Sequence, residues 1–518
     1  MYKECQVRIS PQDASDMLVL KDIASKKLSI ASSKICHIDI LKRSIDARQR
    51  NVFFNLTLGV HIDKLEIREK NFIPNYHDVS NSEKVIIVGA GPAGLFAALH
   101  LIELNFCPII FERGKDVDKR RGDLASLYKT GIVNNNSNFG FGEGGAGTFS
   151  DGKLFTRSKK RGNVGRMMEI LIYHGAKESI LVDSHPHLGT DKLPAIISNI
   201  RKTILKFGGQ VHFDSKVEDF IIKNNKIKGV IVNDAEFLAN NVILATGHSA
   251  RDIYKMLHKR KVLMLNKEIA VGLRLEHPQI EIDCIQYHSK VGRGVYLPAA
   301  EYNFVQKVNG RGVYTFCMCP GGVVVPAATD SNQQVVNGMS ASGRNTKWAN
   351  SAIVTSVWEK ELEAMGYNGL FAALEFQEEL EAQAWKEGGE HLYAPAQRLV
   401  DFLANKESPH LPISSYKPGV KSSLISNWFP SILSNRIREG ISVYGRRSKG
   451  FISGNALFIG VETRTSSPLR IPRGKLSLEH EEIAGLYPCG EGAGYAGGII
   501  SSAMDGENCA NSIAQNNI

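Results

Sequence analysis

The sequence predicts an α/β protein whose central domain is assembled from separated parts of the chain, with one α+β domain inserted into it and a small α+β domain before it. Three observations predict this fold class. A strand-like run from Val85 to Val88 breaks into a glycine-rich turn and then a helix. A second such run, 241–244, stops on Ala-Thr-Gly, and a Gly-Glu pair precedes a helix near the C-terminus. A chain of 518 residues is also too long for one core.

The glycine-rich turn Gly89-Ala90-Gly91-Pro92-Ala93-Gly94 has the spacing of a Rossmann-like dinucleotide cradle. Gly89 allows the tight turn, Gly91 lets backbone N–H groups approach a pyrophosphate, and Gly94 lets the helix lie close on the strand. The N-terminus of that helix presents partial positive charge to the phosphates. The turn therefore predicts the phosphate-binding part of a dinucleotide site.

The next strand, Pro108 to Phe111, ends on Glu112 and Arg113. A carboxylate at this position can accept hydrogen bonds from both ribose hydroxyls of a dinucleotide. We therefore predict that Glu112 binds the ribose; the alternative is a solvated charge at the end of a strand.

Residues 1–80 have a pattern of their own. Alternation at Cys5 to Ile9, Ile35 to Leu41 and Val52 to Leu65, with helical spacing at Asp16 to Lys26, predicts a ferredoxin-like α+β domain. The remaining divisions that we predict are 81–165, 205–262 and 455–518 for the dinucleotide-binding domain, 166–204 for a helical insertion and 263–454 for an inserted substrate domain.

Within these parts, residues 211–238 read as a meander of short strands that includes Val217. The following strand ends on Ala245-Thr246-Gly247, where small residues let the chain pass close to a bound ligand. In the inserted domain, two long helices are expected, Asn350 to Gly366 and Leu370 to Trp385. A last helix is expected from Ile499 to Ala514.

Composition excludes several classes of protein. Hydrophobic content of 43% and charged content of 22% are ordinary for a globular protein, and no run of residues is apolar enough to cross a bilayer. The start of the chain carries no apolar signal core, so we expect a cytoplasmic protein. The net charge of +10 favours anionic ligands, but its clusters lack interleaved aromatic residues, so we do not expect nucleic acid binding.

The 8 cysteines include no C-x-x-C pair, and we expect reduced thiols and no disulfide reductase. Cys317-Met318-Cys319 is a close pair and a redox dithiol is one alternative. A ring closed between such neighbours is short and strained, so the pattern favours packing.

Three separated segments point to one ligand, and their order along the chain is that of flavoproteins of the glutathione-reductase type. Glu491, after Gly490, falls where an acidic residue meets the ribitol and pyrophosphate. Gly497 and Gly498 leave bare the end of the following helix, whose positive dipole would stabilise a reduced flavin. The sequence therefore predicts FAD rather than a nicotinamide as the resident cofactor, held without a covalent link.

The chain also resembles a family, the uncharacterised bacterial FAD-dependent dehydrogenases, which are NAD(P)/FAD-dependent oxidoreductases of the two-domain reductase fold. The matching blocks are Ser44 to Arg48, Gly142 to Leu154, His185 to Asp191, Gly247 to Asp252, Cys317 to Gly322, Gly460 to Pro468 and Gly490 to Gly498. This resemblance implies FAD binding and redox chemistry but no particular substrate.

The predicted cofactor contacts combine these segments with the glycine-rich loop from Gly142 to Gly152, whose Thr148 and Ser150 can bond the flavin near N5 or O4. The full set is Gly89, Gly91, Pro92, Ala93, Gly94, Glu112, Arg113, Gly145, Ala146, Thr148, Ser150, Val217, Ala245, Thr246, Gly247, Gly490, Glu491, Gly497, Gly498 and Ile499.

The catalytic residues are not determined by the sequence, and three candidates stand out. Arg464 offers a fixed fork to an anionic substrate or to the flavin, with a structural ion pair as the alternative. His187 is a candidate proton donor. Lys153 would add positive charge beside the flavin. His185, His187 and Asp191 lack further ligands at metal-site spacing, and we predict no metal.

The predicted function is hydride transfer between flavin N5 and an organic substrate, for which an anionic group is one alternative. A flavin monooxygenase, an FAD-dependent protein that modifies tRNA and a redox-inert FAD-binding protein are the other hypotheses. Without a second dinucleotide motif, NAD(P)H stays open as a transient electron donor. The small-molecule substrate, the direction of reaction and the oligomeric state are left open.

Overall fold

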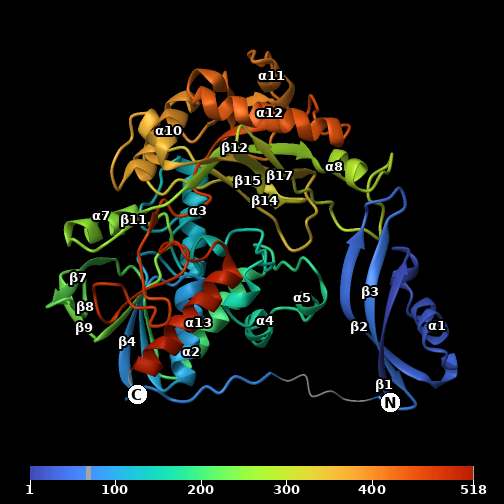
Figure 1. Ribbon diagram of the computed structural model, residues 1–518, viewed down its shortest axis with the longest axis horizontal. Coiled ribbons are helices and arrows are strands. Elements are labelled where there is room, and N and C mark those ends of the chain that lie inside the picture. The colour runs from blue at the N-terminus through green and yellow to red at the C-terminus, as the bar shows by residue number, and fades with distance from the viewer. Residues whose placement is uncertain (66–71, 517–518) are drawn as a thin grey trace.

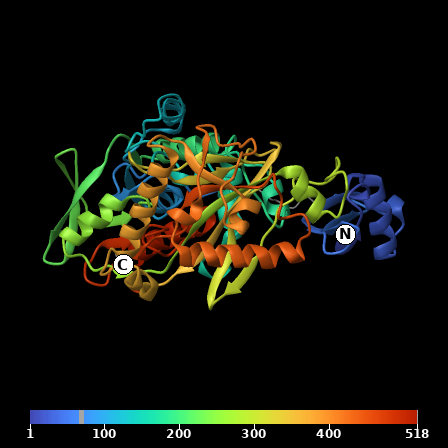
Figure 2. The ribbon, with the colours of Figure 1, turned by 90° about the horizontal axis from the view of Figure 1, so that it is seen from above.

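The computed structural model describes residues 1–65 and 72–516. A small N-terminal unit stands at one end of the long axis, and the three-stranded sheet of β7, β8 and β9 stands at the other (Figures 1 and 2). Between them, a sheet carrying α10, α11 and α12 on its outer side lies over the layer that contains α2 and α13 (Figure 1). Among the described residues, no helix has the length and apolarity needed to span a membrane.

The N-terminal unit is a three-stranded antiparallel sheet with one α-helix, in the order β1-β3-β2. Its elements are β1 (Tyr2–Ile9), η1 (Asp13–Ser15), α1 (Met17–Leu28), η2 (Ser32–Lys34), β2 (Ile35–Asp46) and β3 (Phe53–Ile62). β3 runs antiparallel to both neighbours, which is the βαββ half of a ferredoxin-like fold. The prediction of a complete ferredoxin-like domain therefore exceeds what residues 1–65 form.

The unit is joined to the rest of the chain through the hairpin of β2 and β3. The Arg43 guanidinium lies 2.8 Å from the Asp183 carboxylate, and the Ser184 N–H donates to the Arg43 carbonyl at 3.0 Å. At the tip, His288 Nε2 donates to the Ala47 carbonyl at 2.9 Å. This hairpin fixes the unit to both the dinucleotide-binding domain and the inserted domain.

A five-stranded parallel sheet, in the order β22-β10-β4-β5-β6, forms the centre of the dinucleotide-binding domain. Its strands are β4 (Glu83–Val88), β5 (Phe106–Phe111), β6 (Gln210–His212), β10 (Asn241–Leu244) and β22 (Leu486–Pro488). Residues of β4 and β5 are almost all apolar because a parallel sheet is covered on both faces. Strands from three distant parts of the chain pair here, as a discontinuous domain requires.

Helices α2 and α13 pack against each other on one face of this sheet, together with α4 and α6. The helical elements are α2 (Pro92–Glu103), α3 (Val117–Thr130), η3 (Gly145–Gly147), η4 (Lys159–Arg161), α4 (Val164–Tyr173), α5 (Ser179–Val182), α6 (Leu193–Lys206), α7 (Arg251–Lys259) and α13 (Ile499–Asn516). The predicted meander is a separate antiparallel sheet of β7 (Val217–Lys223), β8 (Lys226–Val232) and β9 (Ala235–Leu238).

The inserted domain is built on a seven-stranded sheet in the order β13-β14-β17-β12-β20-β18-β19. Its main elements are β12 (Ile269–Pro278), α8 (Gln279–Gln286), β13 (Val305–Val308), β14 (Arg311–Cys319), β17 (Trp348–Val357), α9 (Glu359–Ala364), α10 (Ala372–Gly388), β18 (Ala394–Arg398), α11 (Leu399–Ala404), β19 (Val420–Ser422), η5 (Ile425–Asn427), α12 (Ser431–Arg447) and β20 (Leu457–Glu462). Two small two-stranded sheets pair β11 (Leu265–Asn266) with β21 (Leu469–Arg470) and β15 (Val323–Pro326) with β16 (Val336–Met339).

Two expectations about this domain were wrong. The helix expected from Asn350 to Gly366 is mostly β17, a central strand buried on both faces, where burial hides the alternation that would identify a strand. The boundary expected at residue 455 falls before β20, which pairs with β12 and β18. The sheet of the inserted domain therefore continues to Glu462.

Arg274 is a fully buried guanidinium in the middle of this sheet. It contacts Asn350 at 2.9 Å and the Glu462 carboxylate at 3.1 Å. Gly338 on β16 makes room for it, because a Cβ at this position would lie 2.1 Å from Arg274 Nη2 and 2.2 Å from Asn350 Oδ1. A glycine is thus required by packing where the sheet buries a charged side chain.

We expect Gly338→Ala to lower the free energy of unfolding by about 1–3 kcal/mol, because the hydrogen-bonded guanidinium cannot move away from the added methyl group. Urea unfolding followed by circular dichroism measures the change. Gly122→Ala in α3 is the control, since its Cβ would meet no described atom within 4 Å, and it should unfold at the same or a higher urea concentration. Equal stability of wild type and Gly338→Ala would contradict the packing argument.

Candidate functional site

The turn between β4 and α2 has the geometry of a phosphate cradle. Gly89 has φ +105°, and a Cβ on Gly94 would lie 2.0 Å from the Gly89 carbonyl oxygen, so helix and strand pack as the motif predicts. A Cβ on Gly91 would meet no described atom within 4 Å. Gly91, at the N-cap of α2, therefore leaves open space at the positive end of the helix, which is where a pyrophosphate would bind.

The other predicted segments meet this turn. A Cβ on Gly490 would lie 3.0 Å from the Ala93 Cβ, and one on Gly89 would lie 2.9 Å from the Ala245 carbonyl oxygen. A Cβ added to Gly492 would lie 1.9 Å from the Thr246 carbonyl oxygen, and one added to Gly147 would lie 3.3 Å from the Ile499 side chain. The fingerprint, the Ala-Thr-Gly strand, the glycine-rich loop and the C-terminal motif are thus brought together.

Several predicted contact residues face open space. Cβ atoms on Gly247, Gly497 and Gly498 would meet no described atom within 4 Å, and Ala146 is exposed. Two predicted residues are already engaged elsewhere: the Val217 side chain is buried in the core, and Arg113 binds Asp252 at 2.9 Å. Any contact of Val217 with a cofactor would have to use its main chain.

Glu112 follows β5 directly, as predicted, but its carboxylate already accepts hydrogen bonds from the protein. One carboxylate oxygen accepts the N–H groups of Gly114 at 2.9 Å and Gly142 at 3.0 Å, and the other accepts the Ala90 N–H at 2.9 Å. The side chain is 5% exposed. Glu112 therefore joins the fingerprint turn to the glycine-rich loop, and its contact with a ribose stays a prediction.

Arg120 is a site residue that sequence reasoning missed. Its fully buried guanidinium donates to the carbonyl oxygens of Asn138, Phe139, Glu143 and Gly145 at 2.8–2.9 Å, so it holds the start of the glycine-rich loop. Burial lowers its pKa to about 10. A signal existed, because Arg120 shares the buried face of α3 with Val117, Leu124 and Leu127, whereas the sequence had suggested only a charged cluster.

The predicted contacts of Thr148 and Ser150 with the flavin stay predictions, because both hydroxyls already donate to the loop backbone. Thr148 Oγ1 donates to the Glu143 carbonyl at 2.8 Å, and Ser150 Oγ donates to the Gly147 carbonyl at 2.7 Å. Small hydroxyl side chains readily bond backbone within three to five residues in tight loops. Both residues therefore shape the loop from within.

Two of the candidate catalytic residues lie side by side. Lys153 and His187 form an isolated antiparallel bridge. Lys153 Nζ lies 3.2 Å from the buried Asp151 carboxylate, which also binds Arg344 at 2.6 Å. His187 Nε2 donates to the Ser342 carbonyl at 3.1 Å, and burial, with Arg344 nearby, lowers its pKa. His187 is consequently neutral at pH 7.

Arg464 has the structural role that the sequence left as an alternative. Its Nε and Nη2 donate to Glu381, and its Nη1 donates to Thr329 at 2.7 Å. Arg251 donates to the same carboxylate at 2.7 and 2.8 Å. The anion anchor predicted at Arg464 is wrong, because each nitrogen of its guanidinium already binds the protein.

Tyr254 was also missed by the sequence. Its buried hydroxyl lies 2.9 Å from Ser467 Oγ and donates to the Gly492 carbonyl at 2.7 Å. It therefore joins the segment after Arg464 to the C-terminal motif, and its position on the apolar face of α7 gives no sign of this role.

Glu491 carries the most suggestive electrostatics of the predicted contacts. Burial, with the nearby Cys317, raises its pKa to about 7. His248 Nε2 lies 3.8 Å from the Glu491 carboxylate, and burial, together with Arg464 and Arg251, lowers the His248 pKa to about 3. Glu491 can thus gain or lose a proton near neutral pH beside a histidine that stays neutral.

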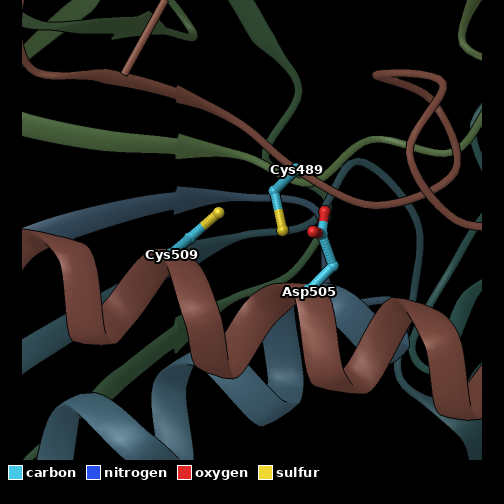
Figure 3. Close-up of side chains that lie close together, drawn as sticks. All are labelled: Cys489, Asp505 and Cys509. Carbon is cyan, nitrogen blue, oxygen red and sulfur yellow. The ribbon is translucent and has the colours of Figure 1, made fainter. Parts of the chain in front are cut away.

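A cluster of Cys489, Asp505 and Cys509 brings potential metal ligands together, within 4.8 Å of one another (Figure 3). Asp505 and Cys509 project from α13 toward Cys489 (Figure 3). The Arg473 guanidinium, however, binds both Asp505 oxygens at 2.6 and 3.1 Å and lies 3.5 Å from Cys509 Sγ. A cationic side chain thus already occupies the position of a metal ion, and we assign no metal here.

The histidine pair of the H-x-H segment does not converge on a common ligand. His185 binds the Glu301 carboxylate, whereas His187 binds the Ser342 carbonyl at 3.1 Å. Asp191 accepts the Ser342 N–H at 2.6 Å. These three side chains stabilise separate loop contacts.

Comparison with known proteins agrees with the geometry. Residues 268–465, which span β12 to β20, match the family described as FAD-dependent protein, C-terminal domain-like. Residues 1–61 match a domain of unknown function. The fold and the site therefore define a dinucleotide-binding protein that carries the C-terminal domain of FAD-dependent proteins.

The chain belongs to the same family as a protein of Clostridium beijerinckii (strain ATCC 51743 / NCIMB 8052) called "Uncharacterized protein". The two are 39% identical over 522 residues, which cover 96% of each chain. The resemblance noted in the sequence thus holds at the level of an FAD-dependent protein, and the dehydrogenase activity stays a prediction.

Three solved structures are similar to most of this chain at low identity. The tetracycline destructase Tet(51) is 13% identical, with 84% of this chain and 82% of that chain covered and a TM-score of 0.33. The flavin-dependent brominase Bmp2 is 11% identical, with 83% and 78% covered and a TM-score of 0.37. Glycine oxidase from Bacillus cereus ATCC 14579 is 13% identical, with 83% and 96% covered and a TM-score of 0.31.

The buried Glu381 predicts how stability depends on pH. Burial alone would raise its pKa, but Arg251 and Arg464 lower it from its ordinary value of 4.5 to about 2. A lowered carboxyl pKa adds stability above pH 4.5 that is lost as the pH falls toward 2. We expect Glu381→Gln to lose about 3–5 kcal/mol at pH 7, since two buried guanidinium groups lose their partner, and to depend less on pH in that window.

Urea unfolding between pH 7 and pH 3 measures this difference. Glu375→Gln on the same helix is the control, because that carboxylate is exposed, and it should keep the wild-type dependence. Parallel pH profiles for wild type and Glu381→Gln would contradict the prediction.

Proposed function

We propose that this protein is an FAD-dependent oxidoreductase that binds FAD without a covalent link and transfers a hydride between flavin N5 and an organic substrate. The observation that supports it best is that Cβ atoms at Gly91, Gly247, Gly497 and Gly498, which belong to three separated segments, would meet no described atom within 4 Å. The family match of residues 268–465 agrees with this assignment.

The residues present fit FAD. The N-terminus of α2 and the open space at Gly91 would hold the pyrophosphate, and the N-terminus of α13, preceded by Gly497 and Gly498, would meet the pyrimidine edge of the flavin. When bound, FAD supplies a centre that takes up or gives a pair of electrons. Glu491, with a pKa near 7, would hold or release a proton at the same site.

Two cationic residues beside a surface cleft support the proposal that the substrate is an anion. A surface cleft of about 400 Å³ is lined by residues 265–268 and by Arg470. Lys267 and Arg470 bring positive charge to this cleft, and Lys267 is close enough to Glu491 for the two charges to interact. These residues replace Arg464 as the proposed anchor for an anion, at the junction of the inserted domain and the C-terminal segment.

The other parts of the prediction remain proposals with less support. We propose NAD(P)H as a transient electron donor. We propose that the protein acts on a small molecule rather than on a nucleic acid or a membrane, and that it is located in the cytoplasm. Oxygen incorporation distinguishes a monooxygenase from a dehydrogenase, because only a monooxygenase transfers an oxygen atom from O₂ to the product. Salt-dependent tRNA binding would favour the modification of tRNA.

The purified protein should be yellow, with about one FAD per chain, because β4 and α2 form one phosphate cradle. Trichloroacetic acid should release all the flavin into the supernatant, where fluorescence and chromatography identify it. Flavin in the pellet would contradict the non-covalent link. A colourless protein that FAD does not restore would overturn the proposed function.

Gly91→Val should keep the fold but lose FAD. The backbone at Gly91, with φ −76° and ψ −176°, suits a β-branched residue, and its Cβ meets no described atom within 4 Å, so the added methyl groups would occupy only the place of the pyrophosphate. We expect FAD affinity to fall at least tenfold, about 1.4 kcal/mol, with an unchanged unfolding midpoint.

Two other substitutions separate binding from folding. Gly94→Val should misfold, since its Cβ overlaps the Gly89 carbonyl, and Gly454→Val in an exposed turn should change neither property. Glu112→Ala should lower stability as well as FAD content, because three backbone N–H groups lose their acceptor. Full FAD occupancy in Gly91→Val after dialysis would mean that the cofactor is placed wrongly.

A further inference from the structure

The end of β14 is distorted where Cys317 and Cys319 lie. Phe316 pairs with Ala352 and Cys319 with Asn350, so β14 contains one extra residue relative to β17, and Cys317 has φ +46°. Such β-bulges re-aim side chains and are frequent beside active sites. The distortion shortens the path between two cysteines that a regular strand would keep apart.

Two cationic groups surround this pair. Arg274 Nη2 lies 3.5 Å from Cys319 Sγ and donates to the Cys317 carbonyl at 2.7 Å. Lys153 Nζ lies 3.9 Å from Cys319 Sγ. A cysteine that only packs needs no charged neighbour: Cys107 in the core donates its S–H to the Gly208 carbonyl, and burial raises its pKa.

The two thiols differ in their protonation. A hydrogen bond from Cys319 lowers the pKa of Cys317, with Lys153 and Arg274 acting in the same direction against burial. The same hydrogen bond and burial raise the pKa of Cys319. Cys317 is therefore the thiol that loses its proton more readily, and a thiolate beside a thiol is the state from which a disulfide forms.

The pair also faces the proposed flavin. Lys153 follows directly on the glycine-rich loop, and Cys317 lies near enough to Glu491 to contribute to the raised pKa of that carboxyl. Cys317 is half-buried, whereas Cys319 is buried, so Cys317 is the more accessible residue of the pair. Cys317 thus lies near the C-terminal segment that is proposed to hold the flavin.

We propose that Cys317 and Cys319 are a redox-active dithiol that exchanges an electron pair with bound FAD, an inference that rests on the proposed function. In the oxidative direction, the Cys317 thiolate and the Cys319 thiol form one S–S bond. Their electron pair and the Cys319 proton pass together to FAD as a hydride equivalent, which leaves reduced, anionic FAD; the charge and the proton balance. The strain of a ring between such close cysteines makes the disulfide easy to reduce again, which suits an exchanging pair rather than a structural bridge.

Anaerobic reductive titration of the oxidised holoprotein with dithionite tests this inference. Wild type should take up two electron pairs, one for FAD and one for the disulfide, and the partly reduced protein should show long-wavelength thiolate-to-flavin absorption. The Cys317→Ser and Cys319→Ser variants should each take up one electron pair. The Cys317→Ser variant should also lack the long-wavelength thiolate-to-flavin absorption. Cys36→Ser, at an exposed cysteine of the N-terminal unit, is the control and should behave as wild type.

A second measurement does not depend on the serine variants folding. In the anaerobic wild type at pH 7, after reduction with two equivalents of dithionite, iodoacetamide should alkylate the half-buried Cys317 before the exposed Cys36. Lys153→Gln should slow the alkylation of Cys317 by about tenfold, which corresponds to a change of one unit in its pKa. Faster alkylation of Cys36 would contradict the thiolate assignment.

The outcomes separate this inference from the proposed function. FAD binding with uptake of one electron pair, and both thiols free in peptide maps of the oxidised protein, would overturn the dithiol and leave the oxidoreductase standing. A protein that binds no FAD would overturn both. Uptake of two pairs that Cys317→Ser reduces to one supports both.

Discussion

Buried guanidinium groups hold the irregular backbone of the candidate site, and most of its geometry depends on them. Loops that pass through a protein interior leave carbonyl oxygens without partners, and an arginine offers five donors in a fixed plane. Arg120 satisfies four carbonyls of the segment 138–145, and Arg274 holds the Cys317 carbonyl together with Asn350 and Glu462. Loop conformation is thus fixed before any ligand binds.

Each of these cations needs a negative partner, which explains the buried carboxylates around the site. Glu381 lies between Arg251 and Arg464, and Asp505 binds Arg473. Glu462 faces Arg274, yet burial still raises its pKa to about 7. Removing one partner of such a pair leaves an uncompensated buried charge, so these residues act as units. The segment around Arg464 is therefore held in position by charge pairing.

The sequence predicts the dinucleotide-binding part of the fold well because its signals are local. The fingerprint turn, the meander and the C-terminal motif each combine a strand period with glycines, and β4, α2, β5 and α13 all lie where those patterns indicate. β17 was taken for a helix because a strand buried on both faces has no alternation to detect. The pairing of β20 with β12 and β18 joins segments that are far apart in the chain, so a local sequence pattern cannot predict it.

Side-chain roles were less predictable than positions. Thr148, Ser150 and Arg464 have the right chemistry for a flavin or an anion, but each is bound by nearby protein groups that only the folded chain brings within reach. Glu112 has the expected place, yet three backbone N–H groups compete for its oxygens. Polar residues near a cleft first satisfy the loops that form it, because an unpaired buried group costs more than one bond to a ligand returns.

The two close cysteine pairs in the described chain show how much the surroundings of a thiol decide. At Cys489 and Cys509, the Asp505 carboxylate is balanced by one cation, Arg473, and the mutual hydrogen bond and burial raise the pKa of Cys489. At Cys317 and Cys319, three cations, Lys153, Arg344 and Arg274, outnumber two carboxylates, Asp151 and Glu462. Thiolate chemistry requires a net positive field. Sulfur proximity alone would give both pairs the same role, whereas the charges around them make only the pair on β14 suited to electron exchange.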